Sequence, residues 1–188
     1  MKLFPSLLRK EGSRGVFKSK MDKYSYNKPK LDIPKSALQR LFDVVSIIAF
    51  MAGTVYLISV WNQLPDQVPA HYNAAGEVNR WGSKWELVIL PIIAVLMAVF
   101  FTFLEKHPEW HNYMNLNRNN IEFQYKNSIL FLNVIKNECV LLFVYLSFNI
   151  AQVALGKAES LGILFLPIFL VIMFGSIAFF IIRSIKHK

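Results

Sequence analysis

The sequence predicts an all-α membrane protein, a four-helix transmembrane bundle with a short ordered outer loop between spans one and two. Three observations predict this class: hydrophobic residues make up 54% of the 188 residues, they occur in four long blocks, and the charged residues gather between those blocks. A helix needs about 20 mainly apolar residues to cross roughly 30 Å of hydrocarbon, and the four blocks are near that length.

We place the spans at about residues 41–61, 86–104, 128–155 and 161–182. Residues 1–40 form a basic cytoplasmic tail, 62–85 the outer loop, and 105–127 a cytoplasmic loop. Spans one and two with their loop (41–104) form one part, and spans three and four (128–188) another. The connection Gly156–Ser160 is very short, which predicts a tight antiparallel hairpin of spans three and four.

The third span carries charges within its apolar run, at Lys136 and Glu138. Either these charges lie at the inner interface or they are partly buried in the bundle. We favour the interface because long side chains can extend toward water. Pro91 and Pro167 occur early in spans two and four, and we expect them to bend both helices at similar depth.

The basic residues predict the orientation. Eleven of the 21 Lys and Arg residues lie in the first 40 positions, and more follow span two and span four, whereas few lie between spans one and two or three and four. Positive loops stay in the cytoplasm, so we expect both termini there, in a multi-pass protein of the cell membrane. The tail carries no nucleic-acid-binding motif, so we expect contact with the lipid bilayer and none with nucleic acid.

Small residues mark expected helix contacts, Ala49 with Gly53 on span one and Ala94 with Ala98 on span two. Each pair is four residues apart and lies on one helix face, where it lets another backbone approach closely. Packing within one bundle explains these pairs better than a dimer interface. The chain has a single cysteine, Cys139, which excludes an intramolecular disulfide and is expected to be a small buried hydrophobe.

The segment between Trp61 and Trp85 is the densest in turn-forming and aromatic residues. Pro65 and Pro69 favour an extended backbone before them, so we expect a short strand near Val68–Tyr72. The run Asn73–Gly76 is a plausible turn, after which Val78–Trp81 can pair back as a second strand.

This loop resembles a bacterial membrane family known as domain of unknown function 1648. The resemblance covers about residues 41–104 and is carried by the outer-loop motif, which consists of Leu64, Pro65, Pro69, His71, Asn73, Gly76, Trp81, Gly82, Ser83, Lys84 and Pro91. The same module opens the longer SdpI-type immunity proteins, which protect cells from a secreted toxin and can signal its presence. The resemblance therefore implies a role in toxin immunity or sensing, although spans three and four do not match the second half of those proteins.

Histidines provide two candidate metal positions. His71 can bind a metal with Asp66 or Glu77, but a structural hydrogen bond to the loop backbone is the simpler interpretation. His107 and His111 have the i, i+4 spacing of helical metal ligands, yet Pro108 replaces the glutamate of the peptidase signature. We therefore expect no metal site.

A polar stripe in span three consists of Glu138, Tyr145, Asn149 and Gln152, at steps of seven, four and three residues. We expect it to face the bundle interior, where it serves either an ion path or interhelical hydrogen bonds. The sequence shows no nucleophile–base pair, phosphate loop or cofactor fingerprint, so we expect no enzyme and no cofactor.

The leading hypothesis from the sequence is a non-enzymatic membrane protein that receives a peptide or an envelope-stress ligand at the outer loop or in a groove beneath it. One alternative is a small transporter or channel subunit that uses the polar stripe. Another is an accessory subunit that assembles with a protein partner.

Overall fold

The computed structural model describes residues 28–114 and 116–187, so most of the predicted basic tail lies outside the described residues. Residues Leu31–Lys188 form one unit. The longer elements of this unit are α2 (Ala37–Val60), β1 (Gln67–Tyr72), β2 (Val78–Ser83), α3 (Ile89–Glu105), α4 (Ile121–Ala154) and α5 (Phe165–Lys186). Short 3₁₀ turns lie at Trp61–Gln63, Lys84–Val88 and Pro108–Trp110.

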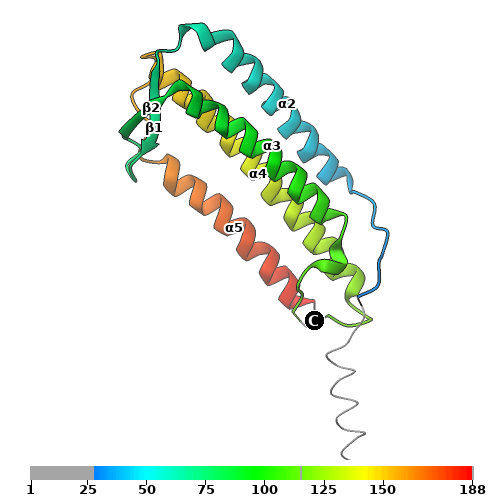
Figure 1. Cartoon of the computed structure of the whole chain (residues 1–188). Coiled ribbons are helices and arrows are strands. Elements are labelled where there is room, and N and C mark those ends of the chain that lie inside the picture. Colours follow the sequence, from blue (N-terminus) through cyan, green and yellow to red (C-terminus); the bar gives the residue numbers. More distant parts are fainter. Residues whose placement is uncertain (1–27, 115, 188) are drawn as a thin grey trace, which may run out of the picture. The chain divides into compact units, whose positions relative to one another are not determined.

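The four helices of this unit run alongside one another, and the β1–β2 hairpin lies at one end of them (Figure 1). We call this the hairpin end and the opposite one, where α2 begins and α5 ends, the far end. Helix α4 is the central element, because α2, α3 and α5 each pack against it. Helices α2 and α3 contact α4 far more than each other, which leaves a groove between them.

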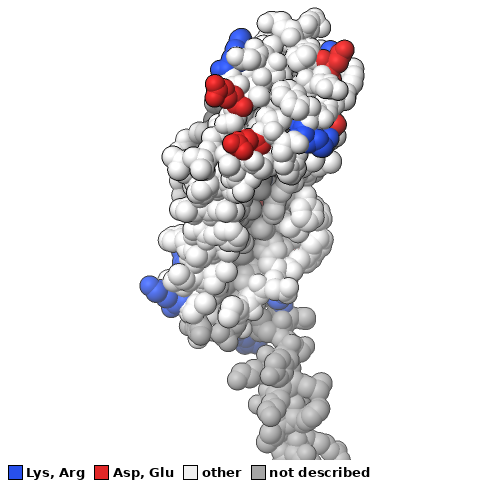
Figure 2. Space-filling view, turned by 90° about the vertical axis from the view of Figure 1, so that its left-hand side faces the viewer, with Lys and Arg blue, Asp and Glu red and all other residues white. Residues whose placement is uncertain are grey.

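The outer surface differs from that of a water-soluble protein, because large apolar side chains cover it while several polar and charged side chains are buried beside the apolar core. Glu105, Asn133 and Lys136 are among the buried residues, whereas Ile58 and Val171 are 70% and 73% exposed. Figure 2 shows an uncharged band on one face, with charged residues above and below it. Lipid is the solvent that such an outer surface requires.

Four helices in the described part of the chain are long and apolar enough to cross a membrane, and a two-stranded antiparallel sheet lies between the first two. The predicted fold class is therefore confirmed. Helix α4 begins at Ile121, earlier than predicted, and at about 1.5 Å per residue its 34 residues exceed the hydrocarbon thickness.

The connection between α4 and α5 differs from the prediction. Helix α5 begins at Phe165 rather than near residue 161, because Gly156 and Gly162 both adopt positive φ angles, 69° and 83°, that a helix does not tolerate. Pro91 and Pro167 both lie in the first turn of their helices, where a missing N–H leaves no carbonyl without its partner. This placement removes the reason for the bends that we expected.

Side chains of α4 hold the far end of α5. The amides of Asn120, Gln124 and Asn127 donate to backbone carbonyls of His187, Ser184 and Phe180, at 3.2, 2.9 and 3.1 Å respectively. The carbonyls of Ser184 and His187 lie at the end of α5, where the last carbonyls of a helix lack partners within it and in lipid must be satisfied by protein. These amides therefore fix where α5 ends along α4.

The small residue Gly53 of α2 lies in close contact with Val144 of α4. A Cβ atom at this position would lie 2.9 Å from Cγ1 of Val144, which is closer than ordinary contact. Ala94 of α3 is only 1% exposed. Both observations agree with the predicted use of small residues for packing inside one bundle.

Candidate functional site

The β-hairpin predicted for the outer loop is present, and it is seated on the helix ends. Strand β1 pairs antiparallel with β2, with Pro69 opposite Trp81 and a register shift between Pro69 and His71. Leu64, Val68 and Pro69 are buried, and the first two join a cluster formed with α2 and α4 side chains. Burial also raises the pKa of Tyr72, at the end of β1, to about 12.

The turn of the hairpin is fixed by Asn73 and Gly76. The Asn73 side-chain oxygen accepts hydrogen bonds from the backbone N–H groups of Ala75 and Glu77, at 2.9 and 3.0 Å. Gly76 has a φ of 79°, and its carbonyl accepts from the N–H of Leu161 at 2.9 Å. A Cβ atom on Gly76 would lie 2.7 Å from the Gly162 carbonyl oxygen. The turn thus docks on the α4–α5 connection, a contact that requires glycine.

The remaining motif residues also set the shape of the loop. The N–H of Lys84 donates to the Asp66 carbonyl at 2.9 Å, and its amine lies 3.4 Å from the Asp66 carboxylate. A Cβ atom on Gly82 would lie 2.8 Å from that of Ala70 across the strands. Pro65 is exposed, Trp81 is half exposed, and Pro91 lies in the first turn of α3.

His71 is placed differently from both interpretations of the sequence. Its Nδ1 lies 2.6 Å from the side-chain oxygen of Asn79 on the facing strand, so its partner is a side chain rather than the loop backbone. The two carboxylates that could share a metal with His71 have other partners: Glu77 accepts a hydrogen bond from Asn73, and Asp66 pairs with Lys84. Within the described ranges, no group of three or more His, Cys, Asp or Glu side chains is close enough to hold a metal ion.

At the far end, a charged cluster joins three helices. It consists of Lys35, Asp43, Glu105 and Lys136. The Lys136 amine lies 2.9 Å from Asp43 Oδ1 and 2.7 Å from Glu105 Oε1. The Lys35 amine lies 2.6 Å from Asp43 Oδ2 and 3.0 Å from Glu105 Oε2. Two cations therefore alternate with two carboxylates, and the cluster has no net charge.

Polar side chains complete the cluster. The Asn133 amide donates to Asp43 at 2.8 Å and to Glu105 at 3.3 Å, and the Asn137 amide donates to Asp43 at 3.2 Å. The Ser46 hydroxyl donates to the Asn137 side-chain oxygen, and Lys136 donates to the Thr102 hydroxyl at 3.3 Å. Asn137 and Lys136 are thereby tied to α2 and α3, so α4 cannot rotate without breaking several of these bonds.

The members of the cluster differ in exposure. The side chains of Glu105 and Lys136 are only 2% and 6% exposed, whereas that of Lys35 is 34% exposed. Lys136 therefore does not extend to water, and the interfacial position that we favoured from the sequence is wrong for this side chain. Lys136 does lie near the far ends of α2 and α3, but it is buried between them. Partial burial would lower the pKa of Lys35, but the adjacent carboxylates of Asp43 and Glu105 outweigh this and raise it above the ordinary lysine value.

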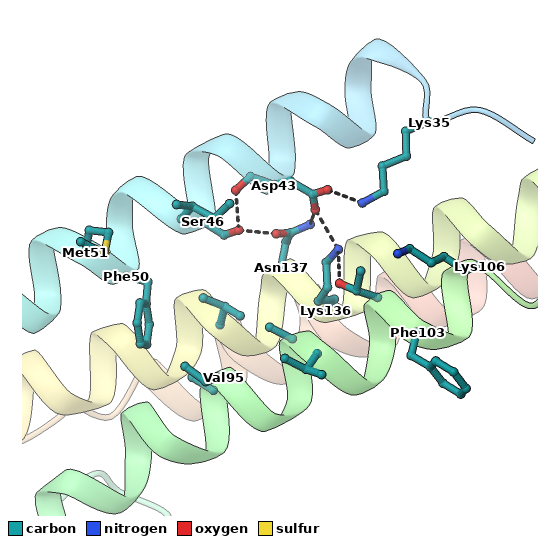
Figure 3. A pocket seen from close by; sticks show the side chains of 16 residues that line it. Lys35, Asp43, Ser46, Phe50, Met51, Val95, Phe103, Lys106, Lys136 and Asn137 are labelled. Atoms are coloured by element: carbon teal, nitrogen blue, oxygen red, sulfur yellow. Dashed lines mark hydrogen bonds and ion pairs between the residues drawn. The ribbon is translucent and has the colours of Figure 1, made fainter.

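The α2–α3 groove opens directly beside the cluster and has a volume of about 610 Å³. Its walls are apolar, with Phe50 and Met51 on α2 and Val95 on α3, and α4 forms its floor (Figure 3). Lys106, an exposed side chain at the end of α3, lies at the charged mouth. The groove is thus apolar along its length and charged at one end. It is therefore complementary to an amphipathic molecule, which has an apolar part and a charged end.

The members of the polar stripe of α4 bond to different elements. Glu138 accepts a hydrogen bond from the Ser176 hydroxyl of α5 at 2.5 Å, and Tyr145 stacks on Phe165 of α5. The Asn149 amide donates to the Ser160 carbonyl at 3.4 Å. The Gln152 amide donates instead to the Tyr56 hydroxyl of α2 at 2.7 Å.

His107 and His111 do not share a helix face. Between them lies a 3₁₀ turn, and His107 stacks on Trp110 with ring centroids 4.2 Å apart. His111 instead contacts the Leu104 carbonyl and the Ser128 hydroxyl, each at 3.0 Å. The two histidines therefore anchor the α3–α4 connection.

Sequence reasoning missed the charged cluster as a unit. It singled out Lys136 as an interfacial charge and placed Glu105 in a loop. The sequence did contain a signal, since three spans carry charges of opposite sign near the same end. Ionisable groups in spans usually pair with one another, so these charges could have been expected to meet.

The fold and its apolar outer surface define a multi-pass integral membrane protein with four candidate spans. Residues 47–95, from α2 through the hairpin to α3, match the family model described as "Domain of unknown function (DUF1648)". The chain therefore carries this domain over those residues, as the outer-loop motif indicated.

The chain is also similar to an uncharacterized protein of the archaeon Archaeoglobus fulgidus. The two are 34% identical over 86 residues, which cover 39% of this chain and 47% of that relative. The chain thus spans about half the length of the relative that it matches. No solved structure matches the chain.

Proposed function

We propose that this protein is a non-enzymatic membrane protein that binds a cationic amphipathic peptide from the bilayer in the α2–α3 groove, in toxin immunity or envelope sensing. The observation that carries the proposal is the charged cluster at the mouth of an apolar groove. A volume of about 610 Å³ lies within the roughly 300–1,000 Å³ typical of ligand sites.

Lys35 gives the site a physical means of ligand exchange. It precedes α2 rather than belonging to it, it is the most exposed member of the cluster, and it bridges Oδ2 of Asp43 and Oε2 of Glu105. An amine of a bound peptide can replace the Lys35 amine between these carboxylates, while the peptide's apolar side chains line the groove. Lys136 stays in place because it is buried and bonded to both carboxylates.

The hairpin supports this function indirectly. Its motif residues hold the ends of α2, α4 and the α4–α5 connection together, which fixes the groove's walls at the hairpin end, whereas at the far end the walls are joined through the charged cluster, whose Lys35 contact a ligand can replace. We propose that the hairpin end lies outside the cell and that the charged mouth faces the cytoplasmic leaflet. The excess of basic residues at the far end supports this orientation.

The test compares two tryptophan variants of α3 in cells that lack the native protein. Ala98→Trp fills the α2–α3 groove, whereas Leu96→Trp places the same side chain on the exposed face of the same helix, where Leu96 is 63% exposed. We expect wild type and Leu96→Trp to protect cells against an amphipathic peptide such as melittin, and Ala98→Trp to fail. Equal protection by both variants, at equal membrane levels, would refute the groove as the site.

A transporter or channel subunit is the second candidate, because ionisable side chains of three spans pair with one another. This function predicts that Glu138→Gln or Asn149→Leu changes ion flux in liposomes, whereas filling the α2–α3 groove does not. Peptide protection without flux supports the first function, and flux without protection supports the second.

A further inference from the structure

A second groove lies on another face of α4, between α4 and α5, and shares no lining residue with the first. This α4–α5 groove has a volume of about 490 Å³. Apolar side chains such as Leu141 and Ile168 form most of its lining, and Glu138 is its one ionisable carboxylate. No Lys, Arg or His belongs to this lining, so the groove carries an uncompensated acidic group.

Glu138 lies deep along the bundle. Its Oε1 accepts a hydrogen bond from Ser176, near the middle of α5, whereas its Oε2 is buried without a hydrogen-bond partner among the described residues. Neither oxygen has a cation within ion-pair distance in the described part of the chain, in contrast to Asp43 and Glu105. A carboxylate in lipid without a cation is costly, and such residues commonly mark functional sites.

Aromatic rings line the groove on the hairpin side of this carboxylate. Tyr145 and Phe165 stack with centroids 5.2 Å apart, and Phe165 stacks in turn on Phe169 at 6.3 Å. The faces of aromatic rings attract cations, most strongly where water is excluded. A carboxylate and aromatic faces in an apolar groove together form the chemistry that recognises an apolar cation.

We propose that the α4–α5 groove binds a lipophilic cation, an organic ammonium or phosphonium with apolar substituents, with Glu138 as its counter-ion. A neutral chain would fill the groove but leave the carboxylate without a cation. An anion would be repelled by it. This site does not depend on the proposed function, because it lies on a different face of α4 from the α2–α3 groove.

The test measures binding of radiolabelled tetraphenylphosphonium to the full chain in lipid nanodiscs. Tetraphenylborate, an anion of the same shape, is the charge control. We expect saturable binding of the cation and none of the anion. Glu138→Gln keeps an oxygen for the Ser176 hydroxyl but removes the charge, and we expect it to weaken cation binding about tenfold or more.

Two further variants separate this site from the rest of the molecule. Glu122→Gln removes the same charge from an exposed position of the same helix and is expected to bind the cation as wild type does. Ile168→Trp fills the groove while keeping Glu138, so it should abolish binding even if Glu138→Gln fails to fold. Unchanged binding in Ile168→Trp, or equal binding of cation and anion, would overturn the proposal.

Discussion

The amine of Lys136 and the carboxylate of Glu105 lie 2.7 Å apart, with side chains only 6% and 2% exposed. This pair joins the central helix α4 to the last residue of α3, and the Lys136 amine also contacts Asp43 of α2. A buried ion pair contributes little net stability when compared with apolar residues, but removing one partner leaves the other charged group without compensation. The cluster therefore sets the positions of three helices more than it strengthens their association.

Removing the central cation should destabilise the bundle. We expect Lys136→Met to lower the free energy of unfolding by about 3–5 kcal/mol, because Asp43 and Glu105 then share only Lys35. Unfolding by sodium dodecyl sulfate in mixed micelles measures this change. The control is Lys126→Met, which breaks an exposed pair with Glu122 on the same helix and should behave as wild type.

Restoring neutrality should recover part of that loss. The double variant Lys136→Met/Glu105→Gln again leaves one cation with one carboxylate, so we expect it to be more stable than Lys136→Met alone. If the double variant were less stable by the sum of the two single effects, the two residues would not be coupled.

Two glycine variants can separate the stability that comes from docking of the hairpin turn from the cost of a positive φ angle. Gly156→Ala carries only the cost of a positive φ, about 1–2 kcal/mol, because no atom lies within 4 Å of the added Cβ. Gly76→Ala carries a similar strain and also a collision with the Gly162 carbonyl. We therefore expect Gly76→Ala to lower the thermal midpoint distinctly more than Gly156→Ala does. Equal shifts would show that the turn contact adds nothing.

The close approach of α2 to α4 depends on Gly53. We expect Gly53→Leu to lower the free energy of unfolding by about 1–3 kcal/mol, because the new side chain forces Val144 and the two helices apart. Gly175→Leu is the matched control, since that helical glycine has open space around it and faces outward. A loss of stability in both variants would indicate an effect of helix propensity or lipid contact rather than of packing.

The proposed orientation can be measured by cysteine labelling, because the chain has one native cysteine, Cys139. In a Cys139→Ser background, Glu77→Cys places a thiol on the exposed hairpin and Lys186→Cys places one at the far end. A membrane-impermeant maleimide should label only the hairpin in intact cells and both positions after permeabilisation. Labelling of Lys186→Cys in intact cells would contradict a cytoplasmic C-terminus.

The hairpin was predictable because its determinants are local. Pro69, Asn73 and Gly76 act on their own backbone and on residues only a few positions away, so their order along the chain carries the information. Its contact with the α4–α5 connection was not predictable, because Gly76 meets Leu161 and Gly162, which are far from it in the sequence.

The sequence by itself determined the four apolar spans and the ordered loop, because length, hydropathy and turn chemistry are properties of continuous segments. Only the tertiary structure decided which charges pair. Whether Lys136 extends to water or lies between Asp43 and Glu105 depends on how three helices are rotated about their axes and shifted along them. Packing fixes these quantities, and no local pattern encodes them. The same rotation placed Glu138 on the opposite side of α4, facing Ser176 rather than the charged cluster.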